Sequence, residues 1–243
     1  DYSFHPAFTE ETETNLKRIP QLIKMGMPTF KLFLPYWREG FAVGDGFMFR
    51  VLERTRGGGG LTLVHAENAG LVARLLGEQE ARGHKSFFQH HLSRPGFVES
   101  ISISTCIELA KAAGAPLYVV HLSTADGLAH MKRAQDEGHP MIGEPCPQYL
   151  AFTNAYYKRK DGHKGIMTPP FREKRDNRAL WAGIQAGTVN CMGTDHCVFT
   201  LKQKDTGKKM FSKVPNGAMG IETQLPSLYS EGVATRRISR ARL

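Results

Sequence analysis

The chain has 243 residues, of which 41% are hydrophobic and 23% are charged, which is ordinary for a globular protein. No apolar run approaches the roughly 20 residues of a membrane span, so we expect no contact with a membrane. Four cysteines without CxxC spacing exclude a disulfide framework and favour a reducing, cytoplasmic location.

The formal net charge of +9 raises the question of a nucleic-acid partner. Basic residues gather near the end of the chain and in one short loop: Arg236, Arg237, Arg240, Arg242, Lys202, Lys204, Lys208 and Lys209. Aromatic residues do not alternate with these charges, as a platform for single-stranded nucleic acid would require. We therefore predict solvated surface charges and no nucleic-acid partner.

Short apolar runs alternate with amphipathic stretches along the chain, which predicts strands that alternate with helices. The predicted strands are Tyr2–His5, Thr29–Leu34, Leu61–Ala66, Pro116–Leu122, Met141–Glu144 and Val189–Thr194. The predicted helices are Glu10–Met25, Gly46–Arg56, Asn68–Arg82, Phe97–Ala113, Ala125–Glu137 and Asp176–Ala186. Glycines just past helix ends fit left-handed caps, and these are Gly26, Gly83, Gly114, Gly138 and Gly187.

This alternation predicts an α/β fold with a parallel sheet covered by helices, either an open doubly wound sheet or a β/α barrel. A dinucleotide-binding sheet would show GxGxxG after its first strand, and the chain has no such motif there. The run Gly57–Gly60 precedes a strand instead, and we interpret it as a flexible connector.

Metal-competent or titratable side chains lie within or at the end of four predicted strands: Lys31, His65, His121 and Asp195. A single histidine that closes an apolar strand is more often structural than catalytic. Groups from the carboxyl ends of several strands, however, are the layout of a β/α-barrel active site. The repeated placement therefore favours the barrel.

These four residue types restrict the chemistry of such a site. Two neutral imidazoles and a carboxylate suit zinc or a similar divalent ion. A lysine ammonium has no lone pair for a metal, whereas a neutral lysine amine can capture carbon dioxide as a carbamate with two ligand oxygens. Asp195 could bind a metal and also move a proton, as hydrolytic metal sites require.

A known family shares many segments of this chain in the same order. They are DYSFH, MGMPTFKLFLPY, LVHAEN, HLSRP, PLYVVHLS, GEPCPQYL, TPPFR, ALWAGI, GTDHCVF and KVPNGAMGIE. With these segments the chain resembles the dihydropyrimidinase/D-hydantoinase family of cyclic amidases, within the amidohydrolase superfamily. The resemblance implies a (β/α)8 TIM barrel of the metal-dependent hydrolase type, two divalent metal ions, with zinc expected, and carbon dioxide bound as the lysine carbamate.

The resemblance also implies metal ligands in this chain. Lys31 corresponds to the carboxylated lysine that bridges both metals. His65 and His121 match ligands of one ion, and Asp195 matches a ligand of the other ion that doubles as general acid and base.

Further residues are implied to contact the substrate. Tyr36, in LPY, matches the tyrosine that binds substrate and stabilises the oxyanion. Thr168, in TPPFR, stands where the family usually has a serine whose backbone binds the substrate ring. Asn216, in PNG, matches another contact to the ring.

The chain departs from the family pattern in one respect. The family's His-x-His metal motif lies on the first barrel strand, and no HxH occurs in this sequence. If Asp195 closes the eighth strand, counting backwards makes DYSFH the third. We therefore expect a single catalytic barrel domain over residues 1–243 that contains strands 3 to 8, about six of the eight strand–helix units. On this count the chain is an internal fragment without the HxH strand and the C-terminal end.

The function implied is hydrolysis of the cyclic amide bond of hydantoins or dihydropyrimidines by a metal-bound hydroxide, as in pyrimidine catabolism. The alternatives are another cyclic amidase, such as an allantoinase or dihydroorotase, and a non-catalytic dihydropyrimidinase-related scaffold. Tyr36 together with GEPCPQYL favours a hydantoinase, and retention of the four strand-end residues argues against the scaffold. The family resemblance implies a homo-oligomer, a tetramer or dimer. The preferred ring and the choice among zinc, manganese and cobalt stay open.

Overall fold

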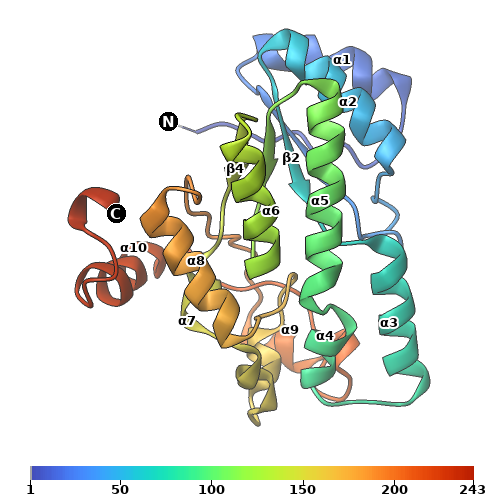
Figure 1. Ribbon diagram of the computed structural model, residues 1–243. Helices are drawn as coiled ribbons and strands as arrows, with labels where there is room; N and C mark the ends of the chain where they lie inside the picture. Colours follow the sequence, from blue (N-terminus) through green and yellow to red (C-terminus); the bar gives the residue numbers. More distant parts are fainter. Residues whose placement is uncertain (1) are drawn as a thin grey trace.

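The computed structural model describes residues 2–243, and it is built around a parallel sheet (Figure 1). Within these residues the sheet has four strands in chain order: β1 (Thr29–Phe33), β2 (Leu61–His65), β3 (Leu117–Val119) and β4 (Met141–Gly143). Their register pairs Phe33 with His65 and Val119 with Gly143, so the carboxyl ends of the strands lie side by side. The α/β fold and the parallel sheet predicted from the sequence are confirmed.

The longer helices agree with the predicted ones to within three residues at either end. They are α1 (Glu13–Lys24), α2 (Asp45–Gly58), α3 (Ala69–Ala81), α5 (Gly96–Ala113), α6 (Ala125–Asp136) and α8 (Lys174–Ala186). Helices α2, α5, α6 and α8 pack against one another in that order, as the outer helices of a barrel do. The architecture is that of a partial (β/α) barrel.

Short helices lie in the connections, and the sequence analysis did not predict them. They are α4 (Phe88–Ser93), α7 (Pro147–Ala151), α9 (Leu201–Asp205) and α10 (Gln224–Leu228). Single 3-10 turns occur at Asn154–Lys158, Gly162–Gly165, Phe211–Lys213 and Arg240–Arg242, and a π turn at Tyr229–Val233. No helix in the described part of the chain is both long and apolar enough to cross a membrane.

The two outermost predicted strands do not form as strands. Asp1 lies outside the described residues. The residue that pairs with β1 is Ala7, two positions after the predicted strand Tyr2–His5, and it makes an isolated parallel bridge to Lys31. Beside β4, the backbone N–H groups of Asn190 and Gly193 donate to the carbonyls of Gly143 and Pro145 at 3.2 and 3.1 Å. The Asn190 side chain accepts the bond from Gly143 N at 3.1 Å and so replaces a ladder carbonyl. Both segments therefore lie at the predicted edges without regular pairing.

The glycine caps are confirmed, while the interpretation of the glycine run was wrong. All five predicted cap glycines have positive φ, between 62° and 87°. Gly57 and Gly58 end α2, and Gly59, with φ of 73°, is its left-handed cap. A side chain at Gly60 would meet Thr55 and Ile23 at 3.1 and 3.2 Å, so the run permits close packing.

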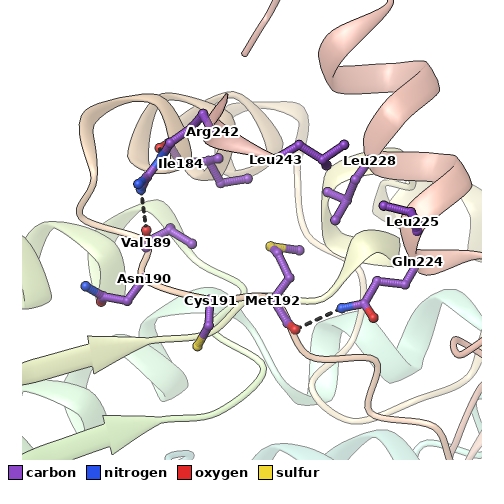
Figure 2. Close-up of a pocket in the computed structure, with 10 residues that line it drawn as sticks. All are labelled: Ile184, Val189, Asn190, Cys191, Met192, Gln224, Leu225, Leu228, Arg242 and Leu243. Atoms are coloured by element: carbon purple, nitrogen blue, oxygen red, sulfur yellow. Dashed lines mark hydrogen bonds between the residues drawn. The ribbon is translucent and has the colours of Figure 1, made fainter. Parts of the chain in front are cut away.

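The segment that follows α8 is held by the end of the chain, which lies beside α8 together with α10 (Figure 1). Arg242 donates to the carbonyl of Val189 at 2.8 Å, and Gln224 donates to that of Met192 at 2.8 Å (Figure 2). A cavity of about 310 Å³ lies between these contacts. Arg242 is exposed, as predicted for a surface charge, yet its guanidinium also bonds the carbonyls of Ile184 and Val189.

The contact between α5 and α6 generates the first prediction. A Cβ at Gly127 would lie 2.7 Å from the buried Ile103 Cδ1 and 2.7 Å from Thr124 Oγ1, which caps α6. We expect Gly127→Ala to lower the free energy of unfolding, because overpacking a core costs about 1–3 kcal/mol and exceeds the roughly 1 kcal/mol that alanine gains in a helix.

Urea unfolding followed by circular dichroism measures this effect. Gly77→Ala is the matched control, because Gly77 lies inside α3 and a Cβ added there would have no neighbouring atom within 4 Å. We expect the control to keep or raise stability. Equal stability of the two variants would contradict the packing argument.

Candidate active site

One cavity of about 560 Å³ opens at the carboxyl ends of the strands, within the size range of small-molecule pockets. All seven residues predicted for the site line it: Lys31, Tyr36, His65, His121, Thr168, Asp195 and Asn216. Lys31 lies in β1 and His65 in β2, and the other five lie in loops. The structure therefore brings together residues that are up to 185 positions apart in the sequence, from Lys31 to Asn216.

The two predicted histidine ligands are neighbours in this cavity. The ring centroids of His65 and His121 are 4.3 Å apart, and both side chains are buried. Burial lowers the pKa of His65 to about 4, although its bond to Glu67 acts in the opposite direction. Burial also lowers the pKa of His121 well below its ordinary value. Both rings are therefore neutral at pH 7, the form that can bind a metal.

His121 and Asp195 have unusual backbone conformations, with φ of 41° and 45°. Side chains other than glycine rarely occupy this left-handed region, and residues held there cluster at functional sites. The prediction that His121 closes its strand was wrong, because β3 ends at Val119 and His121 lies in the turn beyond it. The Nδ1 atom of His121 is buried and has no hydrogen-bond partner among the described residues.

Lys31 and Asp195 place an amine and a carboxyl group in the same cavity. Burial lowers the pKa of Lys31 to about 7, while the carboxylates of Asp195 and Glu144 act to raise it. A substantial fraction of the amine is therefore neutral near pH 7, as carbamate formation requires. Asp195 is exposed at the cavity wall, yet the surrounding protein removes enough water to raise the pKa of its carboxyl, and Lys31 opposes this effect.

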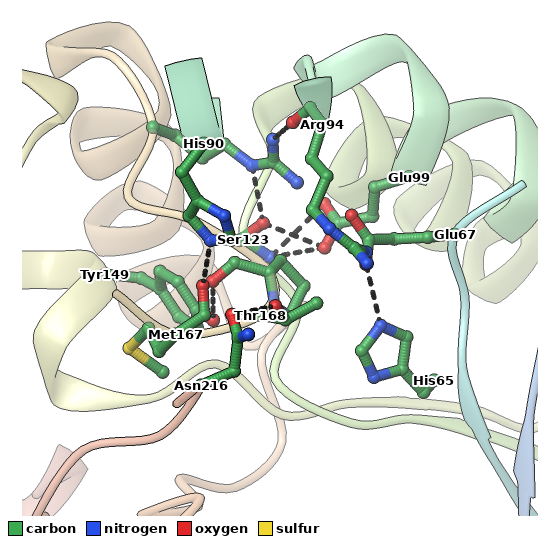
Figure 3. Close-up of polar contacts among 12 residues, drawn as sticks. His65, Glu67, His90, Arg94, Glu99, Ser123, Tyr149, Met167, Thr168 and Asn216 are labelled. Carbon is green, nitrogen blue, oxygen red and sulfur yellow. Dashed lines mark hydrogen bonds and ion pairs between the residues drawn. The ribbon is translucent and has the colours of Figure 1, made fainter. Parts of the chain in front are cut away.

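The predicted substrate contacts occupy other walls of the cavity. Tyr36 packs against Phe41 and His65 with centroid distances of 5.1 and 5.0 Å, and burial raises the pKa of its hydroxyl. The hydroxyl therefore remains a hydrogen-bond donor at neutral pH. Thr168 Oγ1 donates to Asn216 Oδ1 at 2.7 Å, so these two side chains are joined to each other (Figure 3).

Sequence reasoning missed a buried carboxylate that supports His65. Glu67 Oε2 accepts a bond from His65 Nε2 at 2.8 Å and one from Arg94 Nη1 at 2.5 Å (Figure 3). Burial acts to raise the pKa of Glu67, but the Arg94 guanidinium and the His65 bond outweigh it, and the pKa is about 2. Because an ionised carboxylate only accepts, His65 carries its proton on Nε2 and keeps the Nδ1 lone pair for a ligand. The only signal in the sequence is the HAEN segment itself.

Glu144 is a second missed residue, and the sequence did carry a signal for it. It follows β4 directly, at the carboxyl end of the sheet, and it lines the same cavity. Tyr118 OH donates to its Oε2 atom at 2.5 Å, and burial raises the pKa of its carboxyl.

The donor set of the cavity fits one metal ion beside β1 and β2. Within residues 2–243, no three His, Cys, Asp or Glu side chains group closely enough to hold an ion by themselves. Lysine is not among these residue types, and it becomes a ligand only as a carbamate. Two neutral imidazoles, an unpartnered buried Nδ1 atom and a lysine that is partly neutral at pH 7 fit one divalent ion beside Lys31, His65 and His121.

Comparison with known proteins extends these observations. No family model matches the chain. D-phenylhydantoinase of Escherichia coli O1:K1 is 39% identical over 244 residues, which cover 100% of this chain and 52% of that protein. The crystal structure of D-hydantoinase from Bacillus sp. AR9 superposes with a TM-score of 0.96 at 35% identity, and it covers 100% of this chain and 53% of that one. Dihydropyrimidinase from Brevibacillus agri NCHU1002 has the same TM-score and coverage at 33% identity.

The resemblance to the hydantoinase/dihydropyrimidinase family is confirmed. It extends over the whole chain, whereas the chain spans about half the length of the curated relatives it matches. The structural matches also confirm the predicted fold, that of a hydantoinase barrel.

The buried ion pair generates a prediction for stability. We expect Glu67→Gln to lower the free energy of unfolding at pH 7 by about 3–5 kcal/mol, because Arg94 loses the carboxylate that compensates its buried charge. The folded pKa of about 2 lies below the ordinary value of 4.5. The contribution is therefore fully present above pH 4.5 and is lost as the pH falls toward 2.

Urea unfolding of both proteins at pH 7 and pH 3 tests this sign. The difference between parent and variant should shrink at pH 3. Glu80→Gln is the control, since the Arg38–Glu80 pair is partly exposed and worth about 1 kcal/mol or less. A Glu67 variant that behaves like the Glu80 variant would show that the buried pair adds no stability.

Proposed function

We propose that the chain provides the catalytic barrel of a metal-dependent hydrolase that opens the cyclic amide bond of hydantoins or dihydropyrimidines. The observation that carries this proposal is the single cavity lined by all seven predicted site residues. The similarity to D-phenylhydantoinase and to dihydropyrimidinase supports this substrate class. We propose residues 1–243 as a single catalytic barrel domain.

The metal side of the site is proposed from the residues around Lys31. The neutral Lys31 amine attacks carbon dioxide, loses a proton and becomes a carbamate whose oxygens can bind metal. His65 and His121 offer imidazole nitrogens to the same ion, and Asp195 offers its carboxylate to a second one. Two divalent ions, with zinc expected, would supply an activated water and polarise the ring carbonyl when bound.

The remaining residues hold the substrate and move protons. The raised pKa of Asp195 suits a group that takes a proton from the attacking water and returns it to the leaving ring nitrogen. Tyr36 donates its hydroxyl to the oxyanion that develops on the ring carbonyl. Thr168, through its backbone, and Asn216 bind the ring from the loops that line the cavity.

Two further features follow from the same similarity. We propose that the natural polypeptide that carries this chain acts as a cytoplasmic homo-oligomer, a tetramer or dimer. The few cysteines and the absence of CxxC spacing support the reducing compartment.

Ring-opening assays on that polypeptide with hydantoin, dihydrouracil, allantoin and dihydroorotate test the function. We expect turnover of hydantoin or dihydrouracil. Asp195→Asn is the matched control, and its turnover should fall by about 10²–10⁴-fold, the usual range for general acid–base catalysis. A preference for allantoin or dihydroorotate would assign another cyclic amidase, and near-normal turnover of the control would remove Asp195 from the proton path.

Metal content tests the role of Lys31. We expect Lys31→Ala to lose binuclear metal binding, because the carbamate that joins both ions cannot form. Lys31→Arg should fail as well, since a guanidinium remains charged and forms no carbamate. Elemental analysis of the purified variants measures the bound metal, and short carboxylic acids should partly restore activity to Lys31→Ala. Unchanged metal content in both variants would rule out this role.

A further inference from the structure

Lys204 is the buried exception in a loop that the sequence predicts to be solvated. It lies in α9, and its residue is 4% exposed, whereas Lys202, Lys208 and Lys209 are exposed. Its Nζ atom donates to the carbonyl of Ile166 at 2.6 Å and to that of Pro215 at 2.7 Å. The interpretation of Lys204 as a solvated charge was therefore wrong.

The two carbonyls belong to the segments that carry the predicted ring contacts. Ile166 lies two residues before Thr168, and Pro215 lies directly before Asn216. The backbone N–H of Gly217 also donates to the Ile166 carbonyl, at 3.1 Å. With the bond between Thr168 and Asn216, these contacts join the two segments through an ammonium, a backbone bond and a side-chain bond.

The helix that presents Lys204 is itself fixed against both segments. Thr200 and Gln203 form a capping box at its start. Asp205 accepts a bond from His163 at 2.9 Å, and His163 lies in the turn before Ile166. The turn after α9 packs so tightly that a Cβ at Gly207 would lie 2.3 Å from Val214 Cα. Lys204 therefore has little freedom to move away from its two acceptors.

We propose that Lys204 is a positioning residue that sets the spacing of Thr168 and Asn216 and thereby the affinity of the site for the substrate ring. The inference rests on the proposed function, because it assigns these two residues to ring binding. The ammonium lies between two carbonyl oxygens that would otherwise repel each other. Without it the Ile166 oxygen would keep only the Gly217 N–H, and the Pro215 oxygen would lose its bond to Lys204. Charge-assisted bonds of this kind are about twice as strong as neutral ones. Burial lowers the pKa of Lys204 to about 8, so the ammonium is mostly charged at pH 7.

Steady-state kinetics of Lys204→Met in the natural polypeptide test the proposal. We expect KM to rise about 10- to 100-fold, since the loss of hydrogen bonds to a charged donor weakens substrate affinity by about that factor. We expect kcat to change by less than about threefold and metal content to stay constant, because the variant leaves the metal side untouched. Lys202→Met is the matched control from the same helix and should keep the parental KM.

The alternative is a lysine that only stabilises the fold. Such a lysine would lower the amount of active protein and leave KM unchanged, and that result would overturn the proposal. A double variant with Thr168→Val separates the two cases further. If both residues act through one spacing, their effects on KM should be less than multiplicative, whereas independent effects would contradict a shared role.

Hydrogen exchange measured by mass spectrometry gives a readout that needs no activity. The Gly217 amide should exchange at least about tenfold faster in Lys204→Met than in Lys202→Met, because its acceptor segment is released. This result supports the positioning role of Lys204 even if the parent opens none of the tested rings, in which case only the proposed function fails. Equal exchange of the Gly217 amide in the two variants would overturn the positioning role of Lys204. If Lys204→Met does not fold, Lys204→Gln, which keeps a donor, replaces it with the same expectations at smaller magnitude.

Discussion

A buried carboxylate, Glu67, links the end of the sheet to the surrounding loops. It accepts bonds from His65 on β2 and from Arg94 after α4. The carbonyl of Arg94 in turn accepts a bond from the buried Arg172, which also donates to Ser123 beyond β3. Removing one partner of a buried charge is costly, so these bonds hold together the loops that surround the cavity, although Glu67 Oε1 and Arg172 Nη2 have no partner among the described residues. The sheet places His65, and the bond to Glu67 in this network orients its ring and sets its tautomer.

Much of the fold and part of the site follow from local patterns. Helix periodicity and cap glycines depend on residues within a few positions of each other, so α5 and Gly114 were predicted almost to the residue. The placement of Lys31 and His65 in the site follows from a general rule for the carboxyl ends of barrel strands. The prediction of an outer strand at Val189–Thr194 was wrong because the Asn190 side chain accepts the bond from Gly143 N that a strand carbonyl would accept. Sequence periodicity does not reveal such a bond.

The residues that were missed have partners far away in the sequence. Glu67 pairs with Arg94 across 27 positions, and Lys204 bonds Ile166 across 38. An acid in HAEN and a lysine among other lysines look like ordinary surface residues until the tertiary structure buries them. Gly58 and Gly60 were misjudged for the same reason, since a Cβ at either position would crowd Ile23 of α1, at 3.0 and 3.2 Å.

The site thus has two kinds of support. Lys31 and His65 belong to strands whose register is fixed by backbone bonds along the sheet, with Lys31 opposite Leu63 and Phe33 opposite His65. Thr168 and Asn216 lie on irregular segments joined by only a few polar contacts. Because loops tolerate change more readily than paired strands, ring-binding geometry can vary while the positions of Lys31 and His65 are kept. Solved structures named D-hydantoinase and dihydropyrimidinase both match this fold, which is consistent with this division of support.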